Sequence, residues 1–186
     1  MLPERILAAP IALRPFEMRD APRVQLLAGE HEVAETTALI PHPYPDGAAE
    51  AWIAMQAQER AAGREYTYAV TASENGNLVG AIGLRPAPID RESLGYWIGR
   101  PFWDRGYATA AARAIIALAF GLLDVDALTA SHLARNPASG RVMEKCGMRL
   151  LRTGTREHRG AQESFCVRGI TRDRWMEMVD AAGDAG

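Results

Sequence analysis

The chain has few cysteines and no run of apolar residues long enough to cross a bilayer. Its two cysteines among 186 residues, Cys146 and Cys166, give neither a disulfide framework nor the spacing of a metal site. The start of the chain lacks the pattern of a secretory signal peptide. These absences predict a cytoplasmic protein that has no contact with a membrane and binds no metal.

An excess of charge of one sign is also missing. The formal net charge is −2, and the basic residues form no block of the kind that follows a nucleic-acid backbone. The ATP-type loop GxxxxGK[ST] is absent, and so is the GxGxxG that opens a dinucleotide fold. The sequence therefore excludes these two nucleotide-binding classes and predicts no nucleic-acid partner.

The order of the expected elements predicts a mixed α/β protein. Length and ordinary composition favour a single domain over residues 1–186, with flexible ends at 1–9 and 180–186. Hydrophobic patterns and turn signals predict strands over 11–14, 66–70, 78–84, 92–98 and 127–133, and a final hairpin over 150–157 and 163–170. Helices are expected after Asp20, from Asp46 to about Ala62, after Gly106, and over 139–146.

The most informative stretch is residues 103–122, WDRGYATAAARAIIALAFGL. A charged turn leads into a helix in which apolar residues from Ile115 to Leu122 recur with helical spacing. The start of a helix leaves backbone N–H groups without partners and carries partial positive charge, which suits phosphate. Gly106 has no Cβ, so a bulky anion can approach its backbone. The stretch therefore predicts a phosphate-binding turn.

This turn resembles the pyrophosphate loop of the GNAT superfamily of acetyl-CoA-dependent N-acetyltransferases. The family loop reads Gln/Arg-x-x-Gly-x-Gly/Ala, and Trp103, Gly106 and Ala108 hold its first, fourth and sixth places. A second stretch, NPASGRVMEKCGM at 136–148, resembles the family segment that leaves the fifth strand and forms the next helix.

The match is closest to the branch that acetylates protein N-termini, typified by the ribosomal-protein N-acetyltransferases. The stretches at 41–45 and 159–175 also fit that branch, so the resemblance covers roughly residues 10–176. It implies a single GNAT-like fold, in which a central, mostly antiparallel sheet is splayed between its fourth and fifth strands and flanked by helices.

The resemblance also implies how acetyl-CoA is held. The pantetheine arm would pair with the edge of strand 94–98, and a backbone N–H of Tyr96, Trp97 or Ile98 would polarise the thioester. Asn136 would contact the pantetheine or a bound water. The remaining expected cofactor contacts are Arg105, Gly106, Tyr107, Ala108 and Thr109 in the loop, and Ser139, Arg141 and Lys145 in the helix after Asn136.

The expected catalytic residues depart from the usual family pattern. Many family members place a tyrosine acid seven residues after the asparagine, but Met143 stands there, and Ser139 becomes the expected proton donor to the thiolate. Ser139 could instead only stabilise its own helix. Glu92, His132 and Glu163 are the candidates for the base that deprotonates the amine. His132 fits a buried packing role equally well.

The expected reaction is direct attack of a primary amine on acetyl-CoA in a ternary complex. Tyr44, Trp52 and Glu163 would line the acceptor pocket. Neutralising a lysine amine at pH 7 costs about 4.6 kcal/mol, against about 1.4 kcal/mol for an α-amine, so we expect a protein N-terminus. An antibiotic or polyamine acceptor, and a non-catalytic acyl-CoA-binding module, remain alternatives. The sequence is compatible with a monomer and with a homodimer.

Overall fold

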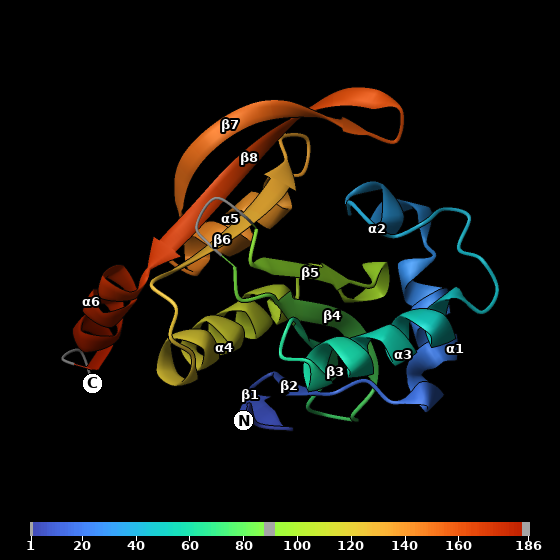
Figure 1. Ribbon diagram of the computed structural model, residues 1–186, viewed down its shortest axis with the longest axis horizontal. Coiled ribbons are helices and arrows are strands. Elements are labelled where there is room, and N and C mark those ends of the chain that lie inside the picture. The colour runs from blue at the N-terminus through green and yellow to red at the C-terminus, as the bar shows by residue number, and fades with distance from the viewer. Residues whose placement is uncertain (1, 88–91, 184–186) are drawn as a thin grey trace.

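The computed structural model describes residues 2–87 and 92–183 and contains two antiparallel sheets with helices around them (Figure 1). The first sheet has the strand order β1-β2-β3-β4-β5, and the second has the order β6-β8-β7. The strands are β1 (Ile6–Ala8), β2 (Ile11–Arg14), β3 (Tyr66–Ala72), β4 (Leu78–Leu84), β5 (Leu94–Ile98), β6 (Ala127–Leu133), β7 (Arg149–His158) and β8 (Ala161–Thr171).

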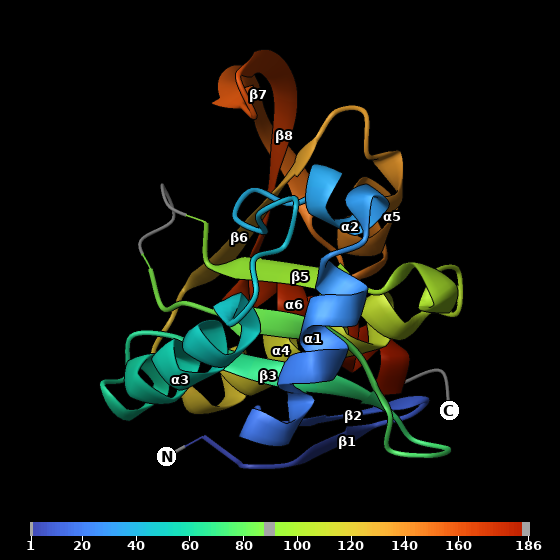
Figure 2. The same ribbon diagram turned by 90° about the vertical axis from the view of Figure 1, so that its right-hand side faces the viewer.

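Helices cover both faces of the larger sheet (Figure 2). Helices α1 and α3 pack on one face, and α4 packs on the other. Helix α5 packs against α4 and β6, and α6 follows β8. The helices are α1 (Ala21–Ala28), α2 (His31–Glu35), α3 (Ala48–Ala61), α4 (Tyr107–Leu122), α5 (Pro137–Lys145) and α6 (Arg172–Gly183), with short 3-10 turns at Met18–Asp20 and Arg100–Phe102. Within residues 2–87 and 92–183, no helix has the length and apolar character to span a membrane.

The two sheets meet just before β5. The backbone N–H of Ser93 donates to the carbonyl of Thr129 in β6 (2.9 Å), and the backbone N–H of Thr129 donates to the Ser93 hydroxyl (2.8 Å). Beyond this junction β5 pairs with β4, and β6 pairs with β8. The sheet is therefore splayed between the strands expected as fourth and fifth, which confirms the fold expected from the sequence.

Side chains of β5 alternate between two apolar cores, as the period of a strand requires. Tyr96 packs against the main core, which lies beneath α4 and includes Ile115 and Met143. Trp97 packs against the smaller core under α1 and α3. The alternation gives β5 one side chain facing α5 and the next facing the helices on the other side of the sheet.

Regular structure reaches into both segments that were expected to be flexible. Residues 1–9 were expected to be flexible, but Ile6–Ala8 forms β1, which pairs with β2. Residues 180–183 belong to α6, and residues 184–186 of the expected flexible tail lie outside the described residues. Helix α3 also begins one residue later than expected, because Gly47 rather than Asp46 is the residue before its first residue.

Candidate active site

The loop before α4 has the geometry of an anion site. Asp104 and Gly106 both have positive φ angles, +60° and +76°, and this turn brings the chain into the start of the helix. The first hydrogen bond of α4 runs from the N–H of Ala110 to the carbonyl of Gly106, and no described side chain caps the helix at Gly106. The N–H groups of the first turn are therefore available to a ligand. A Cβ on Gly106 would have no described atom within 4 Å, so space is open beside it.

A cavity of about 640 Å³ extends from this helix start. Gly106 and Thr109 line it on α4, and the turn at 8–10 between β1 and β2 lines it on the other side. Arg113 and Lys145 add positive charge, and the guanidinium of Arg113 donates to the carbonyl of Lys145 (2.9 Å). Lys145 was expected here. Arg113 was missed, although it lies seven residues after Gly106, two helical turns along the same face. Arg141 is exposed and is not among the lining residues.

The backbone of β5 offers hydrogen-bonding groups on the side away from β4. Gly99 donates to the carbonyl of Val79 in β4, and residues of an antiparallel strand point their backbone groups alternately to one side and the other. Trp97 is paired with Ala81 and shares the orientation of Gly99, whereas Tyr96 and Ile98 point their N–H groups away from β4. Trp97 therefore cannot present its N–H to a thioester, and the expected contact narrows to Tyr96 or Ile98.

Tyr96 and Ser139 meet across the splay. The Tyr96 phenol oxygen lies 2.9 Å from the Ser139 hydroxyl oxygen, and the phenol is 3.1 Å from the Ser139 carbonyl oxygen. Burial raises the pKa of Tyr96, so the phenol keeps its proton at neutral pH. The side-chain oxygen of Asn136 accepts from the Ser139 N–H (3.2 Å) and caps α5. Asn136 thus caps the helix that carries Ser139, and the Ser139 hydroxyl lies beside the Tyr96 phenol.

His132 lies behind this pair, against α5. Its side chain is 8% exposed, and its Nδ1 lies 2.9 Å from the carbonyl oxygen of Leu133. Its Nε2 is buried and has no hydrogen-bond partner among the described residues. A Cβ on Gly140 would come within 2.9 Å of the ring, so the helix approaches the histidine because residue 140 is glycine. His132 therefore faces the α5 side of the sheet.

Glu163 lies on the other side, toward α2. Its carboxylate accepts from Arg135 Nε at 2.8 and 3.0 Å. Arg135 also reaches the Glu35 carboxylate, with its Nη1 3.1 Å away, so it bridges β8 and α2. Arg135 was missed because nothing local in the sequence marks its two partners, which lie far from it in the chain.

Glu92 is exposed at the end of β5 that meets β6. Its carboxylate pairs with Arg156 of β7 at 3.1 Å. The neighbouring residue, Ser93, is buried in the junction with Thr129. Glu92, one of the three expected base candidates, is thus engaged in an ion pair with β7.

Aromatic side chains gather on the face under α1 and α3. Trp52 packs edge-on against Phe16, with ring centroids 4.8 Å apart, and Tyr44 and Trp97 contact the same small core. Burial raises the pKa of Tyr44, and the nearby Glu50 carboxylate raises it further. The structure thus brings Tyr44 and Trp52 together, although neither is fully exposed to a ligand.

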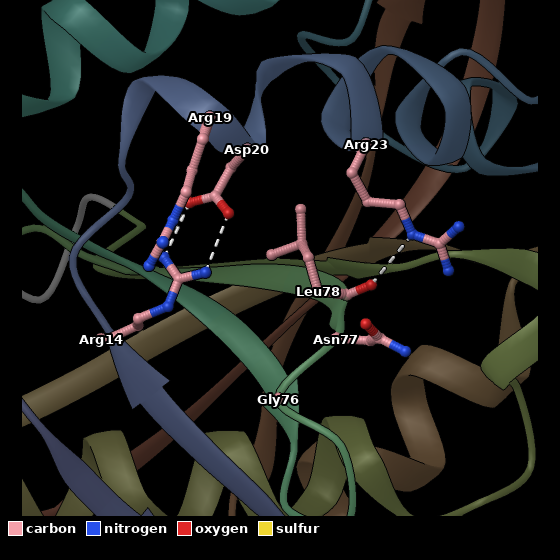
Figure 3. A pocket seen from close by; sticks show the side chains of 7 residues that line it. All are labelled: Arg14, Arg19, Asp20, Arg23, Gly76, Asn77 and Leu78. Atoms are coloured by element: carbon pink, nitrogen blue, oxygen red, sulfur yellow. Dashed lines mark hydrogen bonds and ion pairs between the residues drawn. The ribbon is translucent and has the colours of Figure 1, made fainter.

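A smaller cavity of about 330 Å³ lies between the start of α1 and the turn before β4 (Figure 3). Asp20 accepts two hydrogen bonds from the Arg14 guanidinium, at 2.7 and 2.8 Å, and Arg23 donates to the Leu78 carbonyl. Burial would raise the pKa of Asp20, but the hydrogen bonds from Arg14 and from the Glu17 N–H outweigh it and lower the pKa. None of the expected catalytic residues lines this cavity.

Cys146 is not placed for nucleophilic chemistry. Burial raises the pKa of Cys146 to about 11, and its sulfur lies 3.8 Å from the Thr109 carbonyl oxygen. A thiol that keeps its proton is a poor nucleophile, so Cys146 joins α4 to α5 as a packing residue. Within the part of the chain that the structure describes, no group of three or more His, Cys, Asp or Glu side chains could hold a metal ion.

Comparison with known proteins shows which family this chain belongs to. The family model described as "Acetyltransferase (GNAT) domain" matches residues 11–149. FsC-acetyl coenzyme A-N(2)-transacetylase of Aspergillus fumigatus is 29% identical over 116 residues, which is 55% of this chain and 49% of that protein. The chain spans about half the length of the curated relatives it matches.

Solved structures share the fold. Mycobacterium smegmatis RimJ, in complex with a CoA disulfide, has a TM-score of 0.79 at 20% identity, and the match covers 97% of this chain and 94% of that one. The ribosomal-protein-S5-alanine acetyltransferase from Vibrio fischeri has a TM-score of 0.78 at 14% identity, over 92% of this chain and 98% of its own. Because the family model covers most of the sequence, from β2 to the start of β7, the chain belongs to the GNAT family of acetyltransferases.

Proposed function

We propose that this protein transfers the acetyl group of acetyl-CoA to a primary amine, by direct attack of the amine in a ternary complex. The observation that carries the proposal is the uncapped start of α4 at Gly106, next to a cavity lined by Arg113 and Lys145. The partial positive charge and the N–H groups at the start of α4 suit the pyrophosphate of acetyl-CoA. The side chains of Arg113 and Lys145 suit the remaining phosphate of its nucleotide.

The thioester end of the cofactor would lie in the splay between β5 and β6. A pantetheine arm contains amides, and the backbone edge of β5 that faces away from β4 can pair with it as another strand would. The N–H of Tyr96 or Ile98 would then donate to the thioester carbonyl and stabilise the negative charge that develops on its oxygen. Asn136 keeps the start of α5, and with it Ser139, at this end of the splay.

The reaction needs two proton transfers. The amine nitrogen attacks the carbonyl carbon, the C–S bond breaks, and the sulfur leaves with the electron pair. Ser139 would donate its hydroxyl proton to that thiolate and take the proton of the Tyr96 phenol, which lies 2.9 Å away, and solvent water would return a proton to the phenolate. Glu163 would accept the amine proton, directly or through a water. We favour it over His132 because Glu163 faces α2, whereas His132 is packed against Gly140 of α5.

We propose an α-amine as the acceptor, in line with the branch of N-terminal acetyltransferases that the sequence resembles. The carboxylates near α2 pair with arginines: Glu35 and Glu163 share Arg135, and Glu32 pairs with Arg100. Each of these carboxylates is thereby engaged by an arginine, which weakens its attraction for a polycation. An α-amine also costs less to deprotonate than a lysine.

A second candidate, an acyl-CoA-binding module without catalysis, is favoured by Met143 in place of the usual tyrosine. The test is thiol release from acetyl-CoA by the purified protein, with a peptide carrying a free α-amine, spermidine and an aminoglycoside in separate reactions. Amine-dependent thiol release supports the enzyme. Binding of acetyl-CoA in calorimetry without thiol release for any amine supports the module.

A further inference from the structure

The turn of the β7–β8 hairpin contacts a segment that is far away in the sequence. His158 and Ala161 pair across the hairpin, so Arg159 and Gly160 form a two-residue turn. Figure 1 shows this turn beside α2, at the end of the hairpin that points away from α6. The contacted segment, residues 31–45, holds α2 and the loop that leads to Tyr44.

Arg159 joins two points of that segment. Its Nη2 donates to the carbonyl oxygen of Ala34 at 2.7 Å and to that of Ile40 at 2.6 Å. Ala34 lies in α2, and Ile40 lies in the following loop. One guanidinium therefore ties the end of the helix to the loop and ties both to the hairpin.

The backbone of Arg159 is unusual for this role. Its φ angle is +52°, and that of Gly160 is +78°, as the two central residues of a type I′ turn require. Glycine and asparagine adopt a positive φ angle at the first of these positions readily, whereas arginine is disfavoured in the left-handed region. The turn alone gives no reason for arginine at residue 159, and the two carbonyl contacts of its side chain do.

Two neighbouring side chains hold the same end of α2. His158 is buried, and its Nε2 lies 3.1 Å from the carbonyl oxygen of Glu35. Arg135 donates to that carbonyl as well, at 3.2 Å. A helix of five residues is too short to be stable alone, and cations at its last carbonyls favour it. The position of α2 thus depends on contacts from the hairpin and from Arg135.

We propose that Arg159 is a positioning residue, which clamps residues 31–45 to the hairpin turn and so fixes one wall of the acceptor site. The proposal rests on the proposed function, because this wall contacts an acceptor only if the protein acetylates an amine. The cofactor cavity beside α4 is lined by other residues. Loss of the clamp should therefore weaken use of the acceptor and leave acetyl-CoA binding unchanged.

The test is Arg159→Asn, which removes the guanidinium and places a residue that suits the left-handed turn. Arg149→Asn is the matched control, since Arg149 is exposed at the end of β7 that lies farthest from the turn. Both variants are compared with the wild type in thermal unfolding, in calorimetry with acetyl-CoA, and in initial rates with a varied peptide that carries a free α-amine. Hydrogen–deuterium exchange of residues 31–45 is measured without any acceptor.

For Arg159→Asn we expect faster exchange in residues 31–45 and a KM for the peptide raised about tenfold, as expected for loss of hydrogen bonds to a charged group. The melting temperature and the acetyl-CoA affinity should stay close to those of the wild type, and Arg149→Asn should resemble the wild type throughout. Unchanged exchange, or an unchanged KM with an active enzyme, would overturn the clamp. Faster exchange in a protein that acetylates no amine would retain the contact and contradict the proposed function instead.

Discussion

The phenol oxygen of Tyr96, in β5, lies 2.9 Å from the hydroxyl oxygen of Ser139, in the first turn of α5. Tyr96 and Ser139 lie on opposite sides of the splay between β5 and β6, where the thioester is expected. We expect Ser139→Ala to lower kcat by about 10²–10⁴, the scale of general acid catalysis, with little change in acetyl-CoA affinity. Full activity of this variant would show that water or another group protonates the thiolate.

Tyr96→Phe tests whether the phenol acts through Ser139. We expect kcat to fall, and to fall no further when Ser139→Ala is added, because both changes would interrupt one proton path. Since burial raises the pKa of Tyr96 above its ordinary value, the phenol stays protonated and the ratio of variant to wild-type kcat should be constant from about pH 6 to 9. Additive losses of kcat in the double variant would contradict the coupling.

Glu163 can be tested against a carboxylate on the same hairpin. Glu163→Gln should lower kcat by about 10² or more at neutral pH, because an amide cannot accept the amine proton. Glu157→Gln is the control, since Glu157 is exposed in β7. Equal kcat values for the two variants would exclude Glu163 as the base and favour His132 in that role.

The approach of α5 to His132 predicts a compensating pair of substitutions. Gly140→Ala should destabilise the fold, because its Cβ would come within 2.9 Å of the histidine ring. Removing the ring with His132→Ala should then make Gly140→Ala much less costly. Urea unfolding of the single and double variants measures this coupling. Independent effects of the two substitutions would mean that the ring does not limit residue 140.

The Arg14–Asp20 pair predicts a dependence of stability on pH. The folded-state pKa of Asp20 is lowered, so the pair stabilises the fold above the ordinary pKa of aspartate and loses its effect as the pH falls through the folded-state value. Asp20→Asn should therefore cost about 1.5–3 kcal/mol in the free energy of unfolding at pH 7, and less near pH 3. Asp124→Asn, at an exposed position, is the control. A cost for Asp20→Asn that does not shrink in acid would contradict this assignment.

Local signals in the sequence predicted the elements that carry strong patterns. Strand β4 (Leu78–Leu84) and strand β6 (Ala127–Leu133) have the expected bounds, and Gly106 marks the start of α4. The short elements were missed because contacts from residues outside them hold them. Strand β1 has three residues and depends on β2, and α2 depends on Arg135 and Arg159.

The same limit applies to the candidate site. The loop and the Asn136 segment are each continuous in sequence, so the motifs allow a prediction of which residues approach the cofactor. They did not predict that the Tyr96 phenol reaches Ser139, which is 43 residues away, nor that Arg135 bridges Glu35 and Glu163. Such contacts depend on the angle between the two sheets, which no local pattern encodes.

The cofactor loop is tested by a charge placed at its centre. We expect Gly106→Glu to abolish acetyl-CoA binding, because its carboxylate would occupy the open space beside the helix start and repel the pyrophosphate. Gly121→Glu places the same charge at an exposed position near the other end of α4 and should bind normally. Calorimetry that gives Gly106→Glu the affinity of the wild type would refute the loop assignment.

The most direct test of the central claim is mass spectrometry of a peptide that carries both a free α-amine and a lysine, after incubation with acetyl-CoA and the purified protein. The account predicts one added acetyl group, located on the N-terminal residue by fragmentation, and its loss in Ser139→Ala. An unmodified peptide, or acetylation of the lysine in preference to the α-amine, would contradict it.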